Sequence, residues 1–152
     1  MNKNIMIVGV GGQGSLLASK LLGNVVMASG YDVKVSEVHG MAQRGGSVVT
    51  YVKYSDDKVY SPVINEGEAD MIISFELLEA ARWLPYLKKG GTIVVNNQQI
   101  SPMPVITGAA VYPENIADKL DAVVEDLIVV DALSLAEEAG SAKAVNVVLM
   151  GV

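Results

Sequence analysis

Six residues near the amino terminus have the types and spacing that suit anion binding. Residues 9–14 follow the pattern Gly-x-Gly-x-x-Gly between an expected strand and an expected helix. Gly9 permits a tight turn, Gly11 lets a ligand approach the backbone, and Gly14 allows close packing of the helix on the strand. The first N–H groups of that helix and its dipole favour a phosphate or carboxylate. The alternative is a tight turn that binds nothing. The candidate contacts are Gly9, Gly11, Gly12, Gln13 and Gly14.

A second group of candidates follows the expected second strand. This stretch, residues 37–47, holds the only histidine, His39, together with Arg44, Gly45 and Gly46. In a doubly wound sheet it lies at the carboxyl edge, beside the first glycine turn. Arg44 can grip a phosphate or carboxylate with two parallel hydrogen bonds, and the glycines leave room for backbone N–H groups to form an anion nest. His39 can act as an acid, a base or a neutral donor near neutral pH. Both side chains can instead hold the loop or a partner surface, and for His39 we favour that structural role.

An acidic residue at the end of the second strand completes the fingerprint of a dinucleotide site, because it accepts hydrogen bonds from the ribose. Glu37 lies at about this position. The pattern therefore leaves open a stand-alone dinucleotide-binding module or a small NAD(P)-dependent dehydrogenase. A third alternative is a purely structural interaction protein.

Amide side chains follow a later buried strand, at residues 96–99, and should also reach the carboxyl edge of the sheet. Asn97 is the candidate there, either as a ligand donor or as a turn residue. Glu76 follows another strand and is expected in the first turn of a helix, where the dipole favours an acid. No arrangement typical of a catalytic triad or a metal site is visible, so the catalytic residues stay unassigned.

Composition narrows the class of protein. The 152 residues are 51% hydrophobic and 18% charged, with a net charge of −6, which argues against nucleic-acid binding. The absence of cysteine excludes disulfides, thiolate metal sites, Fe–S ligation and a cysteine nucleophile in this chain. The longest apolar stretch, 16–28, is interrupted by Lys20 and Asn24, so we expect no membrane span. We expect a cytoplasmic protein without a targeting segment.

The periodicity predicts an α/β fold: a Rossmann-like, mostly parallel sheet with helices on both faces, three layers deep, in one domain spanning 1–152. A hairpin is expected where Val59–Tyr60 pairs back on the third strand. Asp131 is expected to cap a helix, and the last helix meets the end of the chain without a stop signal, as if truncated. The expected strands are 5–8, 33–35, 47–54, 71–74, 92–95 and 127–130, and the expected helices are 15–27, 76–86, 113–120, 133–139 and one from 144.

Two stretches together, 9–14 and 36–47, resemble the small (γ-type) subunits of 2-oxoacid:ferredoxin oxidoreductases, and within that family the indolepyruvate branch. The glycine turn alone is unspecific. The string His-Gly-Met-Ala-Gln-Arg-Gly-Gly at 39–46, at this distance after the turn, is highly specific. Further similar stretches lie at 60–62, 66–70, 75–80, 91–96 and 144–149.

The resemblance implies a subunit, inactive alone, of a complex that oxidatively decarboxylates an arylpyruvate or related 2-oxoacid. The products are an acyl-CoA and CO2, and electrons pass to ferredoxin. Thiamine diphosphate, Mg2+ and the Fe–S clusters then belong to a larger partner subunit, with CoA as cosubstrate and no cofactor bound tightly by this chain. By the same resemblance, the glycine turn and Arg44 contact CoA phosphate or the partner, a dimer of heterodimers is expected, and relatives continue for some tens of residues past Val152.

Overall fold

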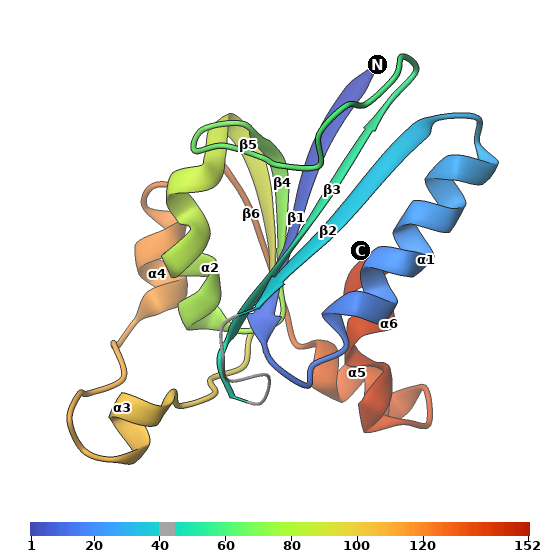
Figure 1. Ribbon diagram of the computed structural model, residues 1–152. Helices are drawn as coiled ribbons and strands as arrows, with labels where there is room; N and C mark the ends of the chain where they lie inside the picture. Colours follow the sequence, from blue (N-terminus) through green and yellow to red (C-terminus); the bar gives the residue numbers. More distant parts are fainter. Residues whose placement is uncertain (40–44) are drawn as a thin grey trace.

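A single sheet runs through the computed structural model, which describes residues 1–39 and 45–152 (Figure 1). Within these residues the sheet has six strands in the order β2-β3-β1-β4-β5-β6. β1, β4, β5 and β6 are parallel, whereas β3 runs antiparallel to both of its neighbours, β1 and β2. The bounds are β1 Asn2–Val10, β2 Asp32–His39, β3 Ser47–Ser55, β4 Ala69–Ser74, β5 Leu87–Asn96 and β6 Asp126–Val130.

Helices cover both faces of the sheet and make three layers, as the sequence predicts (Figure 1). Alternate residues of β1 show the division: Met6 and Val8 pack with α2 and α4, whereas Ile5 and Ile7 pack with α1, α5 and α6. Burial of each such side chain contributes roughly 1.5–3 kcal/mol. The helices are α1 Ser15–Ala28, α2 Leu77–Trp83, α3 Met103–Ile106, α4 Ile116–Asp121, α5 Ala132–Glu138 and α6 Val145–Met150, with short 3-10 turns at Leu84–Tyr86 and Ala142–Ala144.

Two expected helix ends are confirmed. Gly30, with φ of 89°, closes α1 and donates its N–H to the carbonyl of Met27, as a glycine just past a helix end does. The Asp131 carboxylate accepts the Ser134 N–H at 3.1 Å and caps α5. Both features rest on contacts within a few residues, which is why the sequence predicts them.

The predicted hairpin at Val59–Tyr60 is wrong in its position. The antiparallel pair lies between β2 and β3 instead, and residues 58–61 form no strand. The N–H of Val59 is taken by the carboxylate of Asp32 at 2.7 Å, so this group does not extend the sheet. Pro62 directly afterwards has no N–H to give.

Other boundaries differ from the expectation because of the sheet. β5 begins at Leu87, so Lys88–Gly91 belong to a strand rather than to the end of a helix. The pairing of β4 with β5 shifts register between Ala69 and Met71, and a Cβ on Gly91 would lie 3.1 Å from the Asp70 carbonyl oxygen. α4 begins at Ile116 rather than Pro113, and the sequence does not predict α3. No helix among the described residues is long and apolar enough to cross a membrane.

Candidate functional site

The chain changes direction across the sheet at the carboxyl ends of β1 and β4. After β1 it crosses to β2 on one side, and after β4 it continues to β5 on the other side. Ligands of open α/β sheets bind at such a switch point. The turn at 9–14 and the Ser74–Glu76 segment meet here, where the Phe75 N–H donates to the Val8 carbonyl at 2.9 Å.

Gln13 holds this junction together. Its Oε1 accepts the Val10 N–H at 2.7 Å, and its Nε2 donates to the Phe75 carbonyl at 3.1 Å. Both functional groups of the amide therefore have protein partners, one in the turn and one at the end of β4. The geometry gives Gln13 a positioning role rather than an open ligand contact.

The glycines of the turn have roles that differ from those their pattern indicates. Gly9 is part of β1, and a Cβ there would lie 2.8 Å from Gln13 Oε1 and 3.2 Å from Phe75 Cβ, so close packing requires it. The left-handed positions are Gly12, with φ of 96°, and Gly14, with φ of 84°. Among the described residues, no atom lies within 4 Å of a Cβ added to Gly12, so this part of the structure leaves the face of the turn at Gly12 open.

Gly14 faces α6 rather than the strand. A Cβ on Gly14 would lie 2.5 Å from Asn146 Nδ2, and this amide donates to the Gly14 carbonyl at 3.3 Å. The expected close approach exists, but its partner is a side chain 132 positions later in the chain.

The turn offers fewer donors to an anion than its pattern indicates. The Gly11 N–H donates to the Gly46 carbonyl at 2.8 Å, and the Gln13 N–H to the Val10 carbonyl at 3.2 Å. The first bond within α1 runs from the Ala18 N–H to the Gly14 carbonyl at 3.1 Å, so the N–H groups of 15–17 have no acceptor within the helix. An anion here would meet Gly12 and the first turn of α1.

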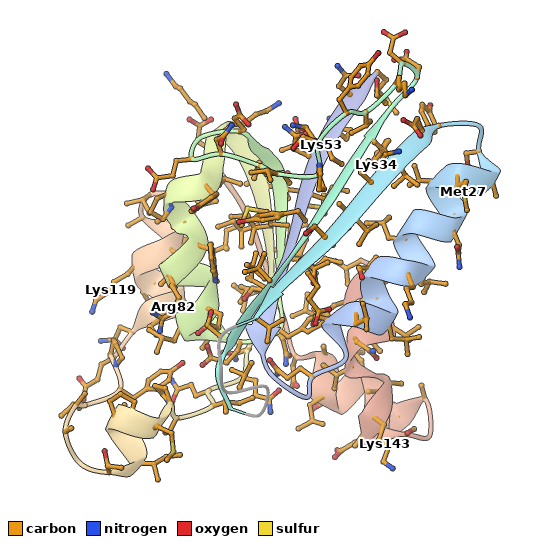
Figure 2. All side chains as sticks on the ribbon, viewed as in Figure 1. Met27, Lys34, Lys53, Arg82, Lys119 and Lys143 are labelled. Carbon is orange, nitrogen blue, oxygen red and sulfur yellow. The ribbon has the colours of Figure 1, made fainter. Side chains whose placement is uncertain are left out.

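Two cavities flank this turn. One, of about 380 Å³, is lined by Gly12, Leu16, Glu37 and Val48 among others. The other, of about 460 Å³, lies on the α5 and α6 side and includes Gln98 and Lys143. Lys143, labelled in Figure 2 beside these helices, brings a positive charge to the second cavity. A cavity of about 630 Å³ lies at the opposite edge of the sheet.

In a Rossmann site the acidic residue at the end of β2 stands next to β1. Here β3 lies between the two strands, although Glu37 still lines the first cavity with Gly12. The carbonyl of Gly46, just before β3, accepts the Gly11 N–H that a pyrophosphate would use. Glu37 therefore lies near the turn, but the Gly11 N–H, one of the donors that a dinucleotide would need, already has a partner within the protein.

The predicted loop after β2 does approach the glycine turn, because Gly46 accepts the hydrogen bond from Gly11. Gly45 is exposed, with φ of 77°. Arg44 and the side chain of His39 lie outside the described residues. Asn97 is exposed, and its N–H donates to the Val130 carbonyl at 2.8 Å.

The neighbouring Asn96 is the structural amide of the same edge. It is buried, its Oδ1 accepts the Ala132 N–H at 3.1 Å, and its Nδ2 donates to Gln98 Oε1 at 2.9 Å. It therefore joins β5 to the start of α5 and leaves Asn97 as the exposed residue of the pair.

Two buried carboxylates lie at the start of α2, on the face of the sheet that α2 and α4 cover. The sequence analysis does not predict that they are buried together. Glu76, 1% exposed, caps α2 rather than occupying its first turn. It accepts the N–H groups of Glu79 at 2.8 Å and Ile100 at 3.1 Å, and the hydroxyl of Tyr112. Burial, together with the hydrogen bond to Glu76 and its charge, raises the pKa of Tyr112 far above its ordinary value.

Glu79, 4% exposed, is the second of these carboxylates. It accepts hydrogen bonds from the Ser47 hydroxyl, from Arg82 Nε at 3.2 Å and from Trp83 Nε1 at 3.3 Å. The sequence signal for the pair was the string Phe-Glu at 75–76 followed by Glu-Ala at 79–80. That string carries no indication of burial.

Known proteins are similar to this chain in sequence. The family model "Pyruvate ferredoxin/flavodoxin oxidoreductase" matches residues 4–152. The chain is 48% identical to "Indolepyruvate oxidoreductase subunit IorB" of Pyrococcus horikoshii, over 97% of this chain and 74% of that protein. It is 44% identical to the subunit of the same name from Archaeoglobus fulgidus, over 99% of this chain and 75% of that protein.

Solved structures share the fold at lower identity. The pyruvate oxidoreductase subunit PORC of Thermotoga maritima matches with a TM-score of 0.71 and 19% identity, over 99% of this chain and 73% of that one. The 2-oxoglutarate:ferredoxin oxidoreductase of Magnetococcus marinus matches with a TM-score of 0.60 and 16% identity, over 95% of this chain but 22% of that longer chain. The chain therefore belongs to the pyruvate ferredoxin/flavodoxin oxidoreductase family, as the resemblance in its sequence predicts.

Proposed function

We propose that this chain is the small subunit of a thiamine-dependent indolepyruvate:ferredoxin oxidoreductase. The complex would convert an arylpyruvate and CoA to an acyl-CoA and CO2 while it reduces ferredoxin. The observation that carries this proposal is the 48% identity, over nearly the whole chain, to subunits named for indolepyruvate oxidoreductase. We place the protein in the cytoplasm and treat residues 1–152 as one γ-type domain.

The residues of this chain do not fit the redox cofactors of such a complex. The sequence has no cysteine to ligate an Fe–S cluster. Among the described residues, no group of three or more His, Asp or Glu side chains could hold a metal ion. As the resemblance to small subunits of this family implies, we assign thiamine diphosphate, Mg2+ and the Fe–S clusters to a larger partner subunit, in a dimer of heterodimers.

For this chain we propose a contact with the phosphate groups of CoA. The open face at Gly12, the first N–H groups of α1 and the charge of Lys143 support an anion at this edge. Arg44, close in sequence to Gly45 and Gly46, adds a guanidinium suited to phosphate. We assign Gly9, Gly11 and Gln13 a role in holding the shape of the turn. Gly9 is closely packed, and hydrogen-bonding groups of Gly11 and Gln13 already have partners within the protein.

Substitution of Arg44 tests this proposal in the assembled complex. Arg44→Ala should raise the KM for CoA by about tenfold, the effect of losing one strong charged contact, with the amount of assembled complex unchanged. Lys119→Ala is the matched control, because this exposed cation lies on α4, away from the turn (Figure 2). If Arg44→Ala prevents assembly, Arg44 is an interface residue. If it changes neither property, the CoA contact is wrong.

Glu37 beside Gly12 favours one second candidate, a stand-alone dinucleotide-binding module or NAD(P)-dependent dehydrogenase. Titration of the purified chain with NADH and NADPH separates the two. Saturable micromolar binding with hydride transfer would contradict the subunit proposal. Purification of the native complex gives the converse test, since a large cysteine-rich, thiamine-binding partner is expected with it. If CoA and phosphate leave the melting temperature unchanged even with that partner, a purely structural role is favoured.

A further inference from the structure

An uncharged arm projects from the carboxyl edge of the sheet. It comprises residues 100–112 and contains α3, and Figure 1 shows it standing away from the sheet, below α2 and α4. The sequence has no Asp, Glu, Lys or Arg from residue 90 to residue 113. None of the arm's residues is buried, so the arm presents uncharged chain to its surroundings over its whole length.

The arm is nevertheless a defined structure with fixed roots. Buried Glu76 holds both ends, because its Oε1 accepts the Ile100 N–H at 3.1 Å and the Tyr112 hydroxyl. The same hydroxyl accepts the Leu78 N–H at 3.2 Å. Within the arm, the Val105 N–H donates to the Pro102 carbonyl at 2.9 Å. The buried carboxylate of Glu76 thus fixes both ends of the arm, although no residue of the arm is itself buried.

Three large apolar residues of the arm are exposed. Met103, Ile106 and Val111 are 63%, 66% and 86% exposed. Exposed apolar residues that gather in one uncharged segment are typical of an interaction site.

We propose that this arm docks into an apolar surface of the partner subunit of the oxidoreductase, and this inference rests on the proposed function. The arm borders the candidate site, since Pro102, Met103 and Pro104 line a cavity of about 210 Å³ together with Gly46 and Glu79. A protein that covers the arm therefore also lies over the carboxyl edge of the sheet.

Two observations favour a different subunit over a second copy of this chain. In the solved 2-oxoglutarate:ferredoxin oxidoreductase the same fold is 22% of a longer chain, so the fold occurs joined to much more protein. Two copies of this chain would each bring a net charge of −6, and like charges oppose association.

The test measures binding of the purified chain to its purified partner subunit. Ile106→Asp and Val111→Asp should each weaken binding by about tenfold or more, as loss of an interface anchor does. Val123→Asp is the matched control, because Val123 is also 66% exposed but lies outside the arm. It should change binding less than twofold, as should Ile106→Leu. Because none of these positions is buried, each variant should keep the wild-type urea midpoint.

The outcomes separate this inference from the proposed function. If the wild-type chain does not bind the partner at all, the proposed function fails. If the wild-type chain and both arm variants bind equally well, the function stands and the docking arm is wrong. If light scattering shows that the isolated chain is a dimer and that Ile106→Asp makes it a monomer, the occupant is a second copy and the inference is overturned. Hydrogen exchange of amides 105–111 should be slower in the complex than in the free chain, where the internal hydrogen bonds of the arm alone protect them.

Discussion

Substitution of Gly14 by alanine should be far more costly than the same change at Gly12, two positions earlier. Both glycines have left-handed backbones, with φ of 84° and 96°. That conformation costs an L-residue about 1–2 kcal/mol. A described residue approaches Gly14, because its added Cβ would lie 2.5 Å from Asn146 Nδ2, whereas no atom of residues 1–39 and 45–152 lies within 4 Å of a Cβ at Gly12.

The size of the difference follows from what Asn146 must do. Asn146 is 6% exposed, so a shift of its side chain strains packed neighbours by about 1–3 kcal/mol. The same shift breaks its hydrogen bond to the Gly14 carbonyl, which contributes about 0.5–1.5 kcal/mol. Gly14→Ala should therefore lower the free energy of unfolding by about 2.5–6.5 kcal/mol, against about 1–2 kcal/mol for Gly12→Ala.

Urea unfolding of the three proteins measures this difference at constant m-value. A double-mutant cycle with Asn146→Ala locates the cause. With the amide removed, the nearest atom of residue 146 is its Cβ, at 3.8 Å from the added Cβ, an ordinary contact. In that background Gly14→Ala should cost only the backbone strain, about 1–2 kcal/mol. Equal losses for Gly14→Ala with and without Asn146 would refute this account of the turn.

Two further predictions concern the buried carboxylate at the root of the arm. Glu76→Ala should lower the free energy of unfolding, measured in urea, by about 2–4 kcal/mol. It removes the cap of α2 and leaves the Ile100 N–H and the Tyr112 hydroxyl without their acceptor. A loss no larger than that of an exposed control such as Glu138→Ala would contradict this prediction. The raised pKa of Tyr112 means that its phenol ionises near pH 10 only in the unfolded chain. The contribution of Tyr112 to the free energy of unfolding is therefore fully present below pH 10, and it is lost as the pH rises from there toward the pKa of the folded state. Tyr112→Phe should lessen that fall, which is measured as the change of the urea midpoint with pH above 10. The same change of midpoint with pH in both proteins would count against this prediction.

Some features of this protein depend on contacts close in sequence, and the sequence predicts them. The helical spacing of 15–27, the cap at Asp131 and the closing glycine at Gly30 involve neighbours a few positions apart. The sequence also predicts the family, because the string at 39–46 is specific in its spacing from the glycine turn. The roles of His39 and Arg44 remain predictions.

Other features depend on which distant segments the fold brings together, and local pattern carries no information about that. The sequence predicts Glu37 at the end of the second strand, as in a dinucleotide site, but β3 lies between that strand and β1 and pairs antiparallel with both. Gly14 is matched to Asn146, 132 positions away, rather than to its own strand. Glu76, which the sequence places in an ordinary first turn, becomes the buried anchor of an arm because Ile100 and Tyr112 converge on it. The sequence determined the glycine turn between β1 and α1, whereas the tertiary structure decided which of its N–H donors remain open, because a hydrogen-bonding group already used within the fold cannot also bind a ligand.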